Sequence, residues 1–382
     1  MTMIYLDNAA TTRPYPEVLD VMRDVAEHQY ANPHALHAFG VSAERLVADA
    51  RKTLAACLRA LPQEVFFTAG GTESNNQVIQ GCAALPERLG KHILTTSIEH
   101  PAVLEPVKRL ERMGFEAERL PVTEDGVPDV THAVSRVRPD TRLLSLMLVN
   151  NETGAILPVA EIVRGARKRN PNLLVHVDAV QAFGKLPVIP KELGADFVSL
   201  SAHKLHGPKG VGLLFVRKGV RLEPLLLGGG QENGMRSGTL NVPGICGFAT
   251  AAAMRHATMR QDAVAVAGLK RLLENGLRES LGDSVRMLSP EASSPYLLLA
   301  SFEKAKAEVL LHHLAERGIM VSSGSACASR KDTRSHVIKA MAVPERWQEG
   351  ILRFSFSAMN TEEDIRAVLE AMRAVYPAVR HK

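Results

Sequence analysis

Short apolar runs alternate along the chain with longer stretches in which apolar residues recur at helical spacing. The apolar runs occupy residues 65–68, 92–96, 143–149, 173–177, 197–201 and 211–216. Runs of this kind, without polar alternation, are typical of strands buried on both faces of a mostly parallel sheet. The stretches between them, such as VAEIVRGARKRN, end in glycine or asparagine, as helices do. The pattern predicts an α/β fold with a mostly parallel central sheet.

A smaller unit of α+β type is predicted in the last third of the chain. A long helical pattern at 245–280 precedes strand-like YLLLASF, helical AEVLLHHLAERG, strand-like ILRFSFS and a final helical segment. We therefore expect a large domain over residues 16–255, and a small domain formed by residues 1–15 together with residues 256–382.

Composition narrows the class of protein. The 382 residues are 46% hydrophobic, which is enough for a large core. The net charge of +5 is too small and diffuse to indicate a nucleic-acid partner. No apolar run is long enough to span a bilayer, and the first residues lack the basic and apolar regions of a signal peptide. These features predict a cytoplasmic protein without a membrane partner.

Cysteine usage predicts neither disulfides nor a metal site. The four cysteines, Cys57, Cys82, Cys246 and Cys327, are far apart, and no spacing typical of zinc occurs. A cytosolic location also argues against structural disulfides. The first three lie in apolar or alanine-rich stretches, so we expect them to be buried. Cys327 has a different context.

Cys327 lies in SSGSACASRKD, a run of small residues that resembles neither a helix face nor a strand face. Basic side chains follow at Arg330, Lys331 and Arg334. The segment, about 321–335, is either a surface loop or an arm that carries a thiol. The basic residues either favour the thiolate or are simply solvated. The residues alone leave both pairs of alternatives open.

Polar residues follow the predicted strands, where α/β proteins bind ligands. After VFFT comes AGGTES, in which Gly71 lets backbone amides approach an anion and Thr72 can cap a helix and reach a phosphate. Alone, this is more often an ordinary strand-to-helix turn. The other runs are followed by His100, Asn151, Asp178, Gln181, His203 and Lys204, with Ser201 at the end of its run.

As a set, these residues suit pyridoxal 5′-phosphate (PLP). This cofactor needs a lysine for a Schiff base, an acid beside its ring nitrogen, donors for its phosphate and a flat group over its ring. The glycines near Lys204 leave room for a cofactor. The glycine spacings of P-loop and dinucleotide-binding sites are absent.

The motifs resemble those of the fold-type I, class V aminotransferase superfamily, and within it the cysteine desulfurases of the NifS/IscS type. The resemblance runs nearly from end to end of the chain. Its motifs, in order, are YLDNAATT, FTAGGTESNN, SIEHPAV, NNETGAI, HVDAVQ, SLSAHKLHGPKGVG, GGGQENGMRSGTLNVPGI, SSGSACAS and LRFSFS.

The resemblance implies roles around the PLP ring. Lys204 would form the Schiff base, and Asp178 would partner the pyridine nitrogen. His100 would stack on the ring and assist proton transfer. Gln181 would contact the ring hydroxyl, and Asn151 would lie beside the ring and the substrate.

The resemblance also implies how the phosphate is bound. Gly71, Thr72, Ser201 and His203 match the phosphate-binding positions of the family. Thr239 matches a residue that reaches the phosphate from a second subunit, which implies a homodimer.

For the reaction, Arg353 matches the residue that binds the substrate carboxylate, and Cys327 matches the nucleophile. The implied activity converts L-cysteine to L-alanine and leaves sulfur on Cys327 as a persulfide. A sulfur-acceptor protein, either an iron–sulfur scaffold or a thiolation enzyme, would then take the sulfur. After the motif of Arg353 the chain continues with Phe356-Ser357-Ala358, so that Ser357 and Ala358 stand where the family has glycine and arginine.

Two other functions remain open at this level. One is a related lyase acting on selenocysteine or cysteine sulfinate, which depends less on a mobile cysteine. The other is a non-catalytic interaction platform that keeps the fold and does not bind the cofactor.

Overall fold

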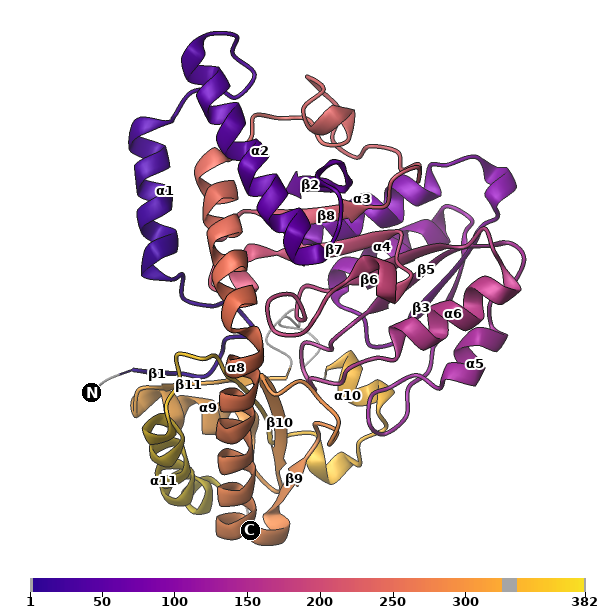
Figure 1. Ribbon diagram of the computed structural model, residues 1–382. Coiled ribbons are helices and arrows are strands. Elements are labelled where there is room, and N and C mark those ends of the chain that lie inside the picture. Colours follow the sequence, from indigo (N-terminus) through magenta and orange to yellow (C-terminus); the bar gives the residue numbers. More distant parts are fainter. Residues whose placement is uncertain (1–2, 325–334, 381–382) are drawn as a thin grey trace.

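A seven-stranded sheet forms the centre of the larger of two lobes (Figure 1). The computed structural model describes residues 3–324 and 335–380. From one edge of the sheet to the other, the strands are β2 (Val65–Thr68), β8 (Gly212–Val216), β7 (Phe197–Ser201), β6 (Leu174–Asp178), β5 (Thr141–Met147), β3 (His92–Thr96) and β4 (Glu116–Leu120). All neighbouring pairs are parallel except those of β8, which runs antiparallel to β2 and β7. The predicted mostly parallel sheet is confirmed.

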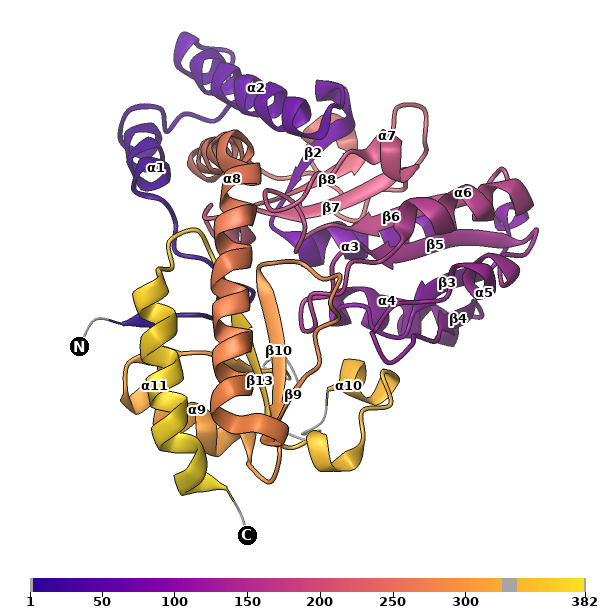
Figure 2. The ribbon, with the colours of Figure 1, turned by 60° about the horizontal axis from the view of Figure 1, so that its bottom comes forward.

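Helices cover both faces of this sheet (Figure 2). On one face, α3 (Gly71–Ala83) and α4 (Pro101–Arg112) pack on alternate strand residues such as Ile93 and Leu143. On the other face, the neighbouring residues Leu94 and Leu144 join a larger core with α5 (Val130–Ser135), α6 (Val159–Arg169) and other helices. Since successive strand residues point to opposite faces, a sheet covered on both sides requires the continuous apolar runs of the sequence.

The edge strand β4 was missed by the sequence pattern. Its sequence is EAERL, and its residues are mostly half-buried or exposed, because only β3 pairs with it. An edge strand therefore lacks the apolar run that marks the buried strands. The short α7 (Pro190–Leu193) connects β6 with β7.

A single helix of 40 residues, α8 (Val242–Leu281), runs through both lobes (Figure 1). It contacts α1 (Pro16–His28) and α2 (Ala38–Leu58) in the larger lobe and α11 (Glu362–Val379) in the smaller one. The domain boundary predicted near residue 255 thus falls inside a continuous helix. The division into two domains stays a prediction.

The smaller lobe contains a four-stranded antiparallel sheet with the order β12 (Ser322–Ser323), β13 (Ile351–Ser355), β10 (Leu297–Phe302) and β9 (Val285–Met287). Near the N-terminus, β1 (Ile4–Tyr5) pairs in parallel with β11 (Ile319–Met320). The remaining helices are α9 (Ala307–Glu316) and α10 (His336–Ala340). Short 3₁₀ turns occur at η1 (Pro62–Glu64), η2 (Glu87–Leu89), η3 (Ala202–Lys204), η4 (Glu232–Gly234), η5 (Gly282–Ser284) and η6 (Glu345–Trp347).

The described residues contain neither a membrane-spanning helix nor a metal-binding cluster. None of the helices there combines the length and apolar character needed to cross a membrane. In residues 3–324 and 335–380, no three histidine, cysteine or acidic side chains are grouped so that they could hold a metal ion.

Candidate active site

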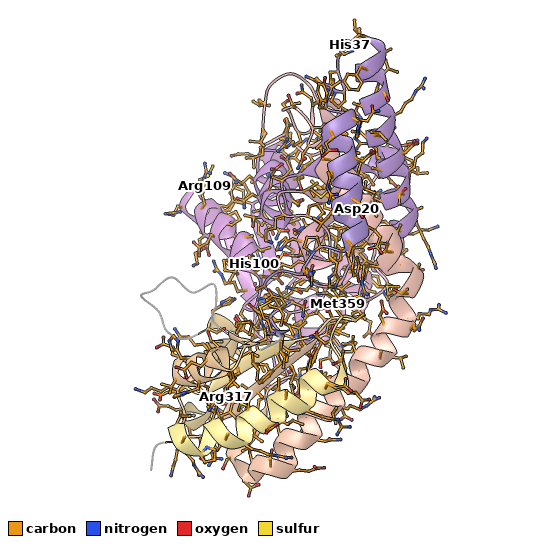
Figure 3. All side chains as sticks on the ribbon, turned by 90° about the vertical axis from the view of Figure 1, so that its left-hand side faces the viewer. Asp20, His37, His100, Arg109, Arg317 and Met359 are labelled. Carbon is orange, nitrogen blue, oxygen red and sulfur yellow. The ribbon has the colours of Figure 1, made fainter. Side chains whose placement is uncertain are left out.

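The carboxyl ends of the parallel strands bring most of the predicted site residues together. Asp178 ends β6, Ser201 ends β7, and Lys204 lies in the 3₁₀ turn that follows Ser201. His100 follows β3 and lies where the larger lobe meets the smaller one (Figure 3). Asp178 and Lys204 both act electrostatically on His100, so the three groups share one site.

Asp178 is a buried carboxylate held by neutral donors. Asn75 Nδ2 donates to Asp178 Oδ2 at 2.7 Å, and the backbone N–H of Val180 donates to Oδ1 at 3.0 Å. No basic side chain in the described part of the chain forms an ion pair with Asp178. A buried carboxylate without a cationic partner is costly, so this position suits a ligand that brings its own positive charge, such as a protonated pyridine nitrogen.

Asn75 lies within the FTAGGTESNN motif, but the sequence alone does not assign a role to its side chain. Its side chain is buried in α3 and points to a residue that is 103 positions away in the sequence. Asn75 Oδ1 has no hydrogen-bond partner among the described residues. The motif marked this region, but only the fold reveals the contact with Asp178.

We expect Asn75→Ala to destabilise the protein, because it leaves the buried Asp178 carboxylate without its side-chain donor. The expected loss in the free energy of unfolding is about 1–3 kcal/mol. Denaturant unfolding measures it, with Asn76→Ala as the control, since the Asn76 side chain donates to the Thr72 carbonyl on its own helix. Equal effects of the two substitutions would contradict this role of Asn75.

Lys204 points to the N-terminal segment. Its Nζ donates to the carbonyl oxygens of Ala9 and Ala10 at 2.7 and 2.8 Å. The segment is fixed there because the Thr12 N–H and hydroxyl both bind the His203 carbonyl. The YLDNAATT motif therefore lies beside the lysine, although the two are almost 200 residues apart in the sequence.

His100 is held as a neutral ring with a defined tautomer. Its Nδ1 accepts a hydrogen bond from the Ala102 N–H at 3.0 Å, where it caps α4. Burial lowers the pKa of His100. The negative charge of Asp178 raises this pKa, and the positive charge of Lys204 lowers it. A neutral histidine that accepts at Nδ1 carries its proton on Nε2. That proton is available to a ligand.

The neighbouring Glu99 is a buried acid that the sequence analysis did not assign. Its Oε1 accepts from the Thr96 hydroxyl at 2.6 Å and from the Met147 N–H at 3.0 Å. Its Oε2 has no hydrogen-bond partner in the described residues. Burial raises the pKa of Glu99 to about 8, so the carboxyl is largely protonated at neutral pH. The Glu99 backbone carbonyl accepts from His336 Nε2 at 2.8 Å, which ties the His100 segment to α10.

The raised pKa of Glu99 predicts a pH dependence of stability. The protonated acid stabilises the folded state fully below its ordinary pKa of 4.5, and this contribution is lost as the pH rises through about 8. We expect Glu99→Gln to gain about 2–4 kcal/mol relative to the wild type between pH 5 and pH 9.

Denaturant unfolding across this pH range measures the difference. Glu105→Gln is the matched control, since Glu105 is exposed on α4 and pairs with Lys108. If the Glu99→Gln and wild-type stability curves stay parallel across the whole pH range, Glu99 does not titrate as described.

An anion-binding position lies at the N-terminus of α3. A Cβ on Gly71 would come within 2.6 Å of Val180 Cγ2, so glycine lets the backbone lie this close to the turn that follows β6. The first backbone N–H groups of a helix favour an anion. The expectation that Thr72 caps this helix is wrong. Gly70 is the N-cap, and Thr72 lies exposed in the first turn, because the helix begins two residues earlier than predicted.

His203, two residues after Ser201, is a neutral ring. Burial, followed by Lys204, lowers the pKa of His203 to about 4. His203 Nδ1 is 3.1 Å from the Thr11 hydroxyl, which leaves Nε2 for another group. Ser201, at the end of β7, is buried next to it.

Arg353 presents its guanidinium from β13 of the smaller lobe and is 4% exposed. Nη1 donates to the Asn151 carbonyl at 2.9 Å, and Nη2 donates to Asp7 Oδ1 at 2.8 Å. Its Nε has no hydrogen-bond partner among the described residues. A buried guanidinium with an unused donor suits a carboxylate ligand. Arg353 and Asn151, predicted for the substrate, are thus adjacent.

The remaining predicted residues differ in how far the structure describes them. Gln181 is buried, and its Nε2 donates to the Ala9 carbonyl at 2.9 Å. Thr239 is exposed between η4 and α8, so its expected contact from a second subunit stays a prediction. Cys327 lies outside the described residues, as do Arg330, Lys331 and Arg334.

These residues fit PLP on structural grounds. The helix N-terminus beside Ser201 and the space kept by Gly71 suit a phosphate. The buried Asp178 has no cationic partner among the described residues and suits a protonated ring nitrogen. Arg353 Nε has no partner in that same part of the chain, and its guanidinium suits an amino-acid carboxylate. An amine, Lys204, and a flat neutral ring, His100, complete the set.

Comparison with known proteins places the chain in a family. The family "Aminotransferase class-V" matches residues 4–368. The "Cysteine desulfurase IscS" of Dictyoglomus turgidum is 38% identical, over 99% of this chain and 95% of that protein. A solved "NIFS-LIKE PROTEIN" superimposes with a TM-score of 0.94 at 39% identity, covering 99% of this chain and 100% of its own. A structure described as "SspA in complex with cysteine" gives a TM-score of 0.82 at 33% identity, covering 94% and 100%.

The chain therefore belongs to the class V aminotransferases, and within them to the cysteine desulfurases of the NifS/IscS type. The resemblance found in the sequence motifs and the expected fold are both confirmed.

Proposed function

We propose that this protein is a PLP-dependent enzyme that converts L-cysteine to L-alanine and transfers the sulfur to Cys327. The observation that carries the proposal is the meeting of Lys204, Asp178 and His100 at one end of the sheet, opposite Arg353 of the smaller lobe. The first three suit the cofactor, and Arg353 suits the carboxylate of an amino acid. The cysteine that is bound in the solved relative supports the same substrate.

Each residue has a task that follows from its surroundings. Arg353 would bind the substrate carboxylate, and its guanidinium is held by Asp7 and the Asn151 carbonyl. Asp178 holds the ring nitrogen in its protonated form, supported by Asn75. Bound PLP supplies an electron sink for the electrons released at the substrate Cα. The Lys204 amine takes the Cα proton, and His100 keeps a proton on Nε2 beside the ring.

The transfer of sulfur from L-cysteine to Cys327 requires no external oxidant. The Cys327 thiolate attacks the substrate sulfur, an S–S bond forms, and the bond between sulfur and Cβ breaks. The electron pair of that bond stays on carbon and is protonated, so alanine leaves and Cys327 carries a persulfide. A sulfur-acceptor protein, an iron–sulfur scaffold or a thiolation enzyme, then attacks the persulfide. A homodimer completed by Thr239, and a cytoplasmic location, belong to the same proposal.

Single-turnover chemistry tests the proposal. The purified protein, loaded with PLP, is mixed with L-cysteine, alanine is measured, and the persulfide is mapped by mass spectrometry. We expect one alanine for each sulfur added to Cys327. Alanine formation with no sulfur on Cys327 would contradict the assigned nucleophile. Turnover of cysteine sulfinate or selenocysteine but not of cysteine would favour the related lyases.

A further inference from the structure

Lys185 is a buried lysine that the proposed reaction does not use. It is 5% exposed and lies in the turn after β6, four residues beyond Gln181. No acidic side chain in the described part of the chain forms an ion pair with it. Its Nζ donates to Gln181 Oε1 at 3.1 Å and lies 5.9 Å from the centre of the Tyr296 ring. A buried lysine without an acidic partner lowers the stability of the folded state. Its presence therefore indicates a functional role.

A chain of hydrogen bonds connects Lys185 to the candidate catalytic lysine. Lys185 donates to Gln181 Oε1, and Gln181 Nε2 donates to the Ala9 carbonyl at 2.9 Å. The same carbonyl accepts from Lys204 Nζ at 2.7 Å. The first three members are buried, so water does not compete for their hydrogen bonds.

We propose that Lys185 is a positioning residue that fixes the orientation of the Gln181 side-chain amide beside Lys204 and the cofactor. An amide can turn over and exchange its oxygen and nitrogen ends, because the two ends are nearly equal in shape. A lysine ammonium can only donate, and a carbonyl can only accept. Lys185 therefore holds Oε1 at one end, and the Ala9 carbonyl holds Nε2 at the other.

Both charge states of Lys185 can donate to Gln181 Oε1, and the ammonium form, which has no lone pair, excludes the reversed amide. Burial lowers the pKa of Lys185 to about 7, and the nearby cations Lys204, Arg255 and Arg353 lower it further in that order. The amine thus exists in both forms near neutral pH, and both forms carry N–H donors. The Tyr296 ring, itself held by Arg255 Nη2 at its hydroxyl, packs against the amine.

This role rests on the proposed function, in which the NH2 group of the Gln181 side-chain amide would contact the PLP ring. Without Lys185, the buried Oε1 would lose its donor, and the amide could turn its oxygen toward Ala9 and the ring. If the ring oxygen of bound PLP is deprotonated, it can only accept, so an amide oxygen facing it would repel it and the cofactor would be held less tightly.

The test is a double-mutant cycle on the PLP-loaded protein. Lys185→Met, Gln181→Leu and the combined variant are dialysed, and the rate of PLP release and the absorption maximum of the bound cofactor are recorded. We expect Lys185→Met to release PLP about tenfold faster than the wild type and to shift the absorption maximum. In the Gln181→Leu background the same substitution should change neither quantity.

Lys270→Met is the matched control, because Lys270 is also a buried lysine but donates to Ser293 in the smaller lobe. It should leave PLP release unchanged. Thermal unfolding of each variant separates loss of folding from loss of positioning, and Lys185→Met should unfold no earlier than Lys270→Met. Equal effects of Lys185→Met with and without Gln181, or no effect in either, would overturn the inference. A wild type that binds no PLP would instead overturn the proposed function.

Discussion

Lys204→Ala should lower the rate of alanine formation from L-cysteine by about 10²–10⁴-fold. The substitution removes the amine that we propose takes the Cα proton. Lys185 Nζ is a poor substitute for it, because it is buried and donates to Gln181. The effect should fall on kcat, because Arg353 still binds the substrate carboxylate.

The measurement is alanine release under saturating L-cysteine, together with the absorption spectrum of bound PLP. Borohydride reduction of the wild type should fix the cofactor to Lys204, and peptide mapping identifies the site. Lys209→Ala is the control, since Lys209 lies in the same SLSAHKLHGPKGVG motif but is exposed. Wild-type turnover by Lys204→Ala, or a cofactor fixed to another lysine, would contradict the role of Lys204.

Folding must be checked in this variant, because the Lys204 amine also organises the N-terminal segment. It donates to the carbonyls of Ala9 and Ala10, which lose a donor in Lys204→Ala. The segment keeps its other hydrogen bonds, including those of Thr12 to the His203 carbonyl. We therefore expect a modest loss of stability and an intact fold, so that a large loss of rate reports the chemistry.

The fold could be predicted where burial on both faces leaves a continuous apolar run. Strands β2, β3 and β7 occupy the predicted residues 65–68, 92–96 and 197–201. The polar edge strand β4 was missed, because its residues are only partly buried. The antiparallel direction of β8 was also not predicted, because an apolar run has no direction and the short connection from β7 to β8 contains glycines rather than a crossover helix.

The candidate site could be predicted where residues follow a strand directly. Asp178, Ser201 and Lys204 were found in this way, because the carboxyl ends of parallel strands meet at one edge. Asn75, Glu99 and Lys185 could not be assigned, because their roles depend on contacts or burial rather than on sequence position. Asn75 contacts Asp178 across 103 residues, and the raised pKa of Glu99 comes from burial by several elements.

Cys327→Ala should abolish the transfer of sulfur to the protein and lower alanine formation by at least about a hundredfold. The substitution removes the thiolate that breaks the bond between sulfur and carbon, while Lys204, Asp178 and Arg353 remain. PLP absorption and the binding of L-cysteine should therefore persist. The variant thus distinguishes the loss of sulfur transfer from the loss of cofactor or substrate binding.

The other cysteines are poor substitutes for Cys327. Burial raises the pKa values of Cys57 and Cys246 to about 11, and burial raises that of Cys82 as well. All three are therefore thiols near neutral pH, and the thiolate is the nucleophile. We expect alkylation at neutral pH to label Cys327 first, and Cys246→Ala to keep full activity.

The contrast between Cys327→Ala and Cys246→Ala decides between the two kinds of enzyme that the family motifs allow. If Cys327→Ala still releases alanine from L-cysteine at the wild-type rate, sulfur leaves without a protein thiol, as in the related lyases. If alanine and persulfide are lost together in Cys327→Ala only, each alanine formed requires the thiol. In that case the residues around Asp178 and Lys204 prepare the substrate, and the identity of the acceptor is decided by what can reach the Cys327 persulfide.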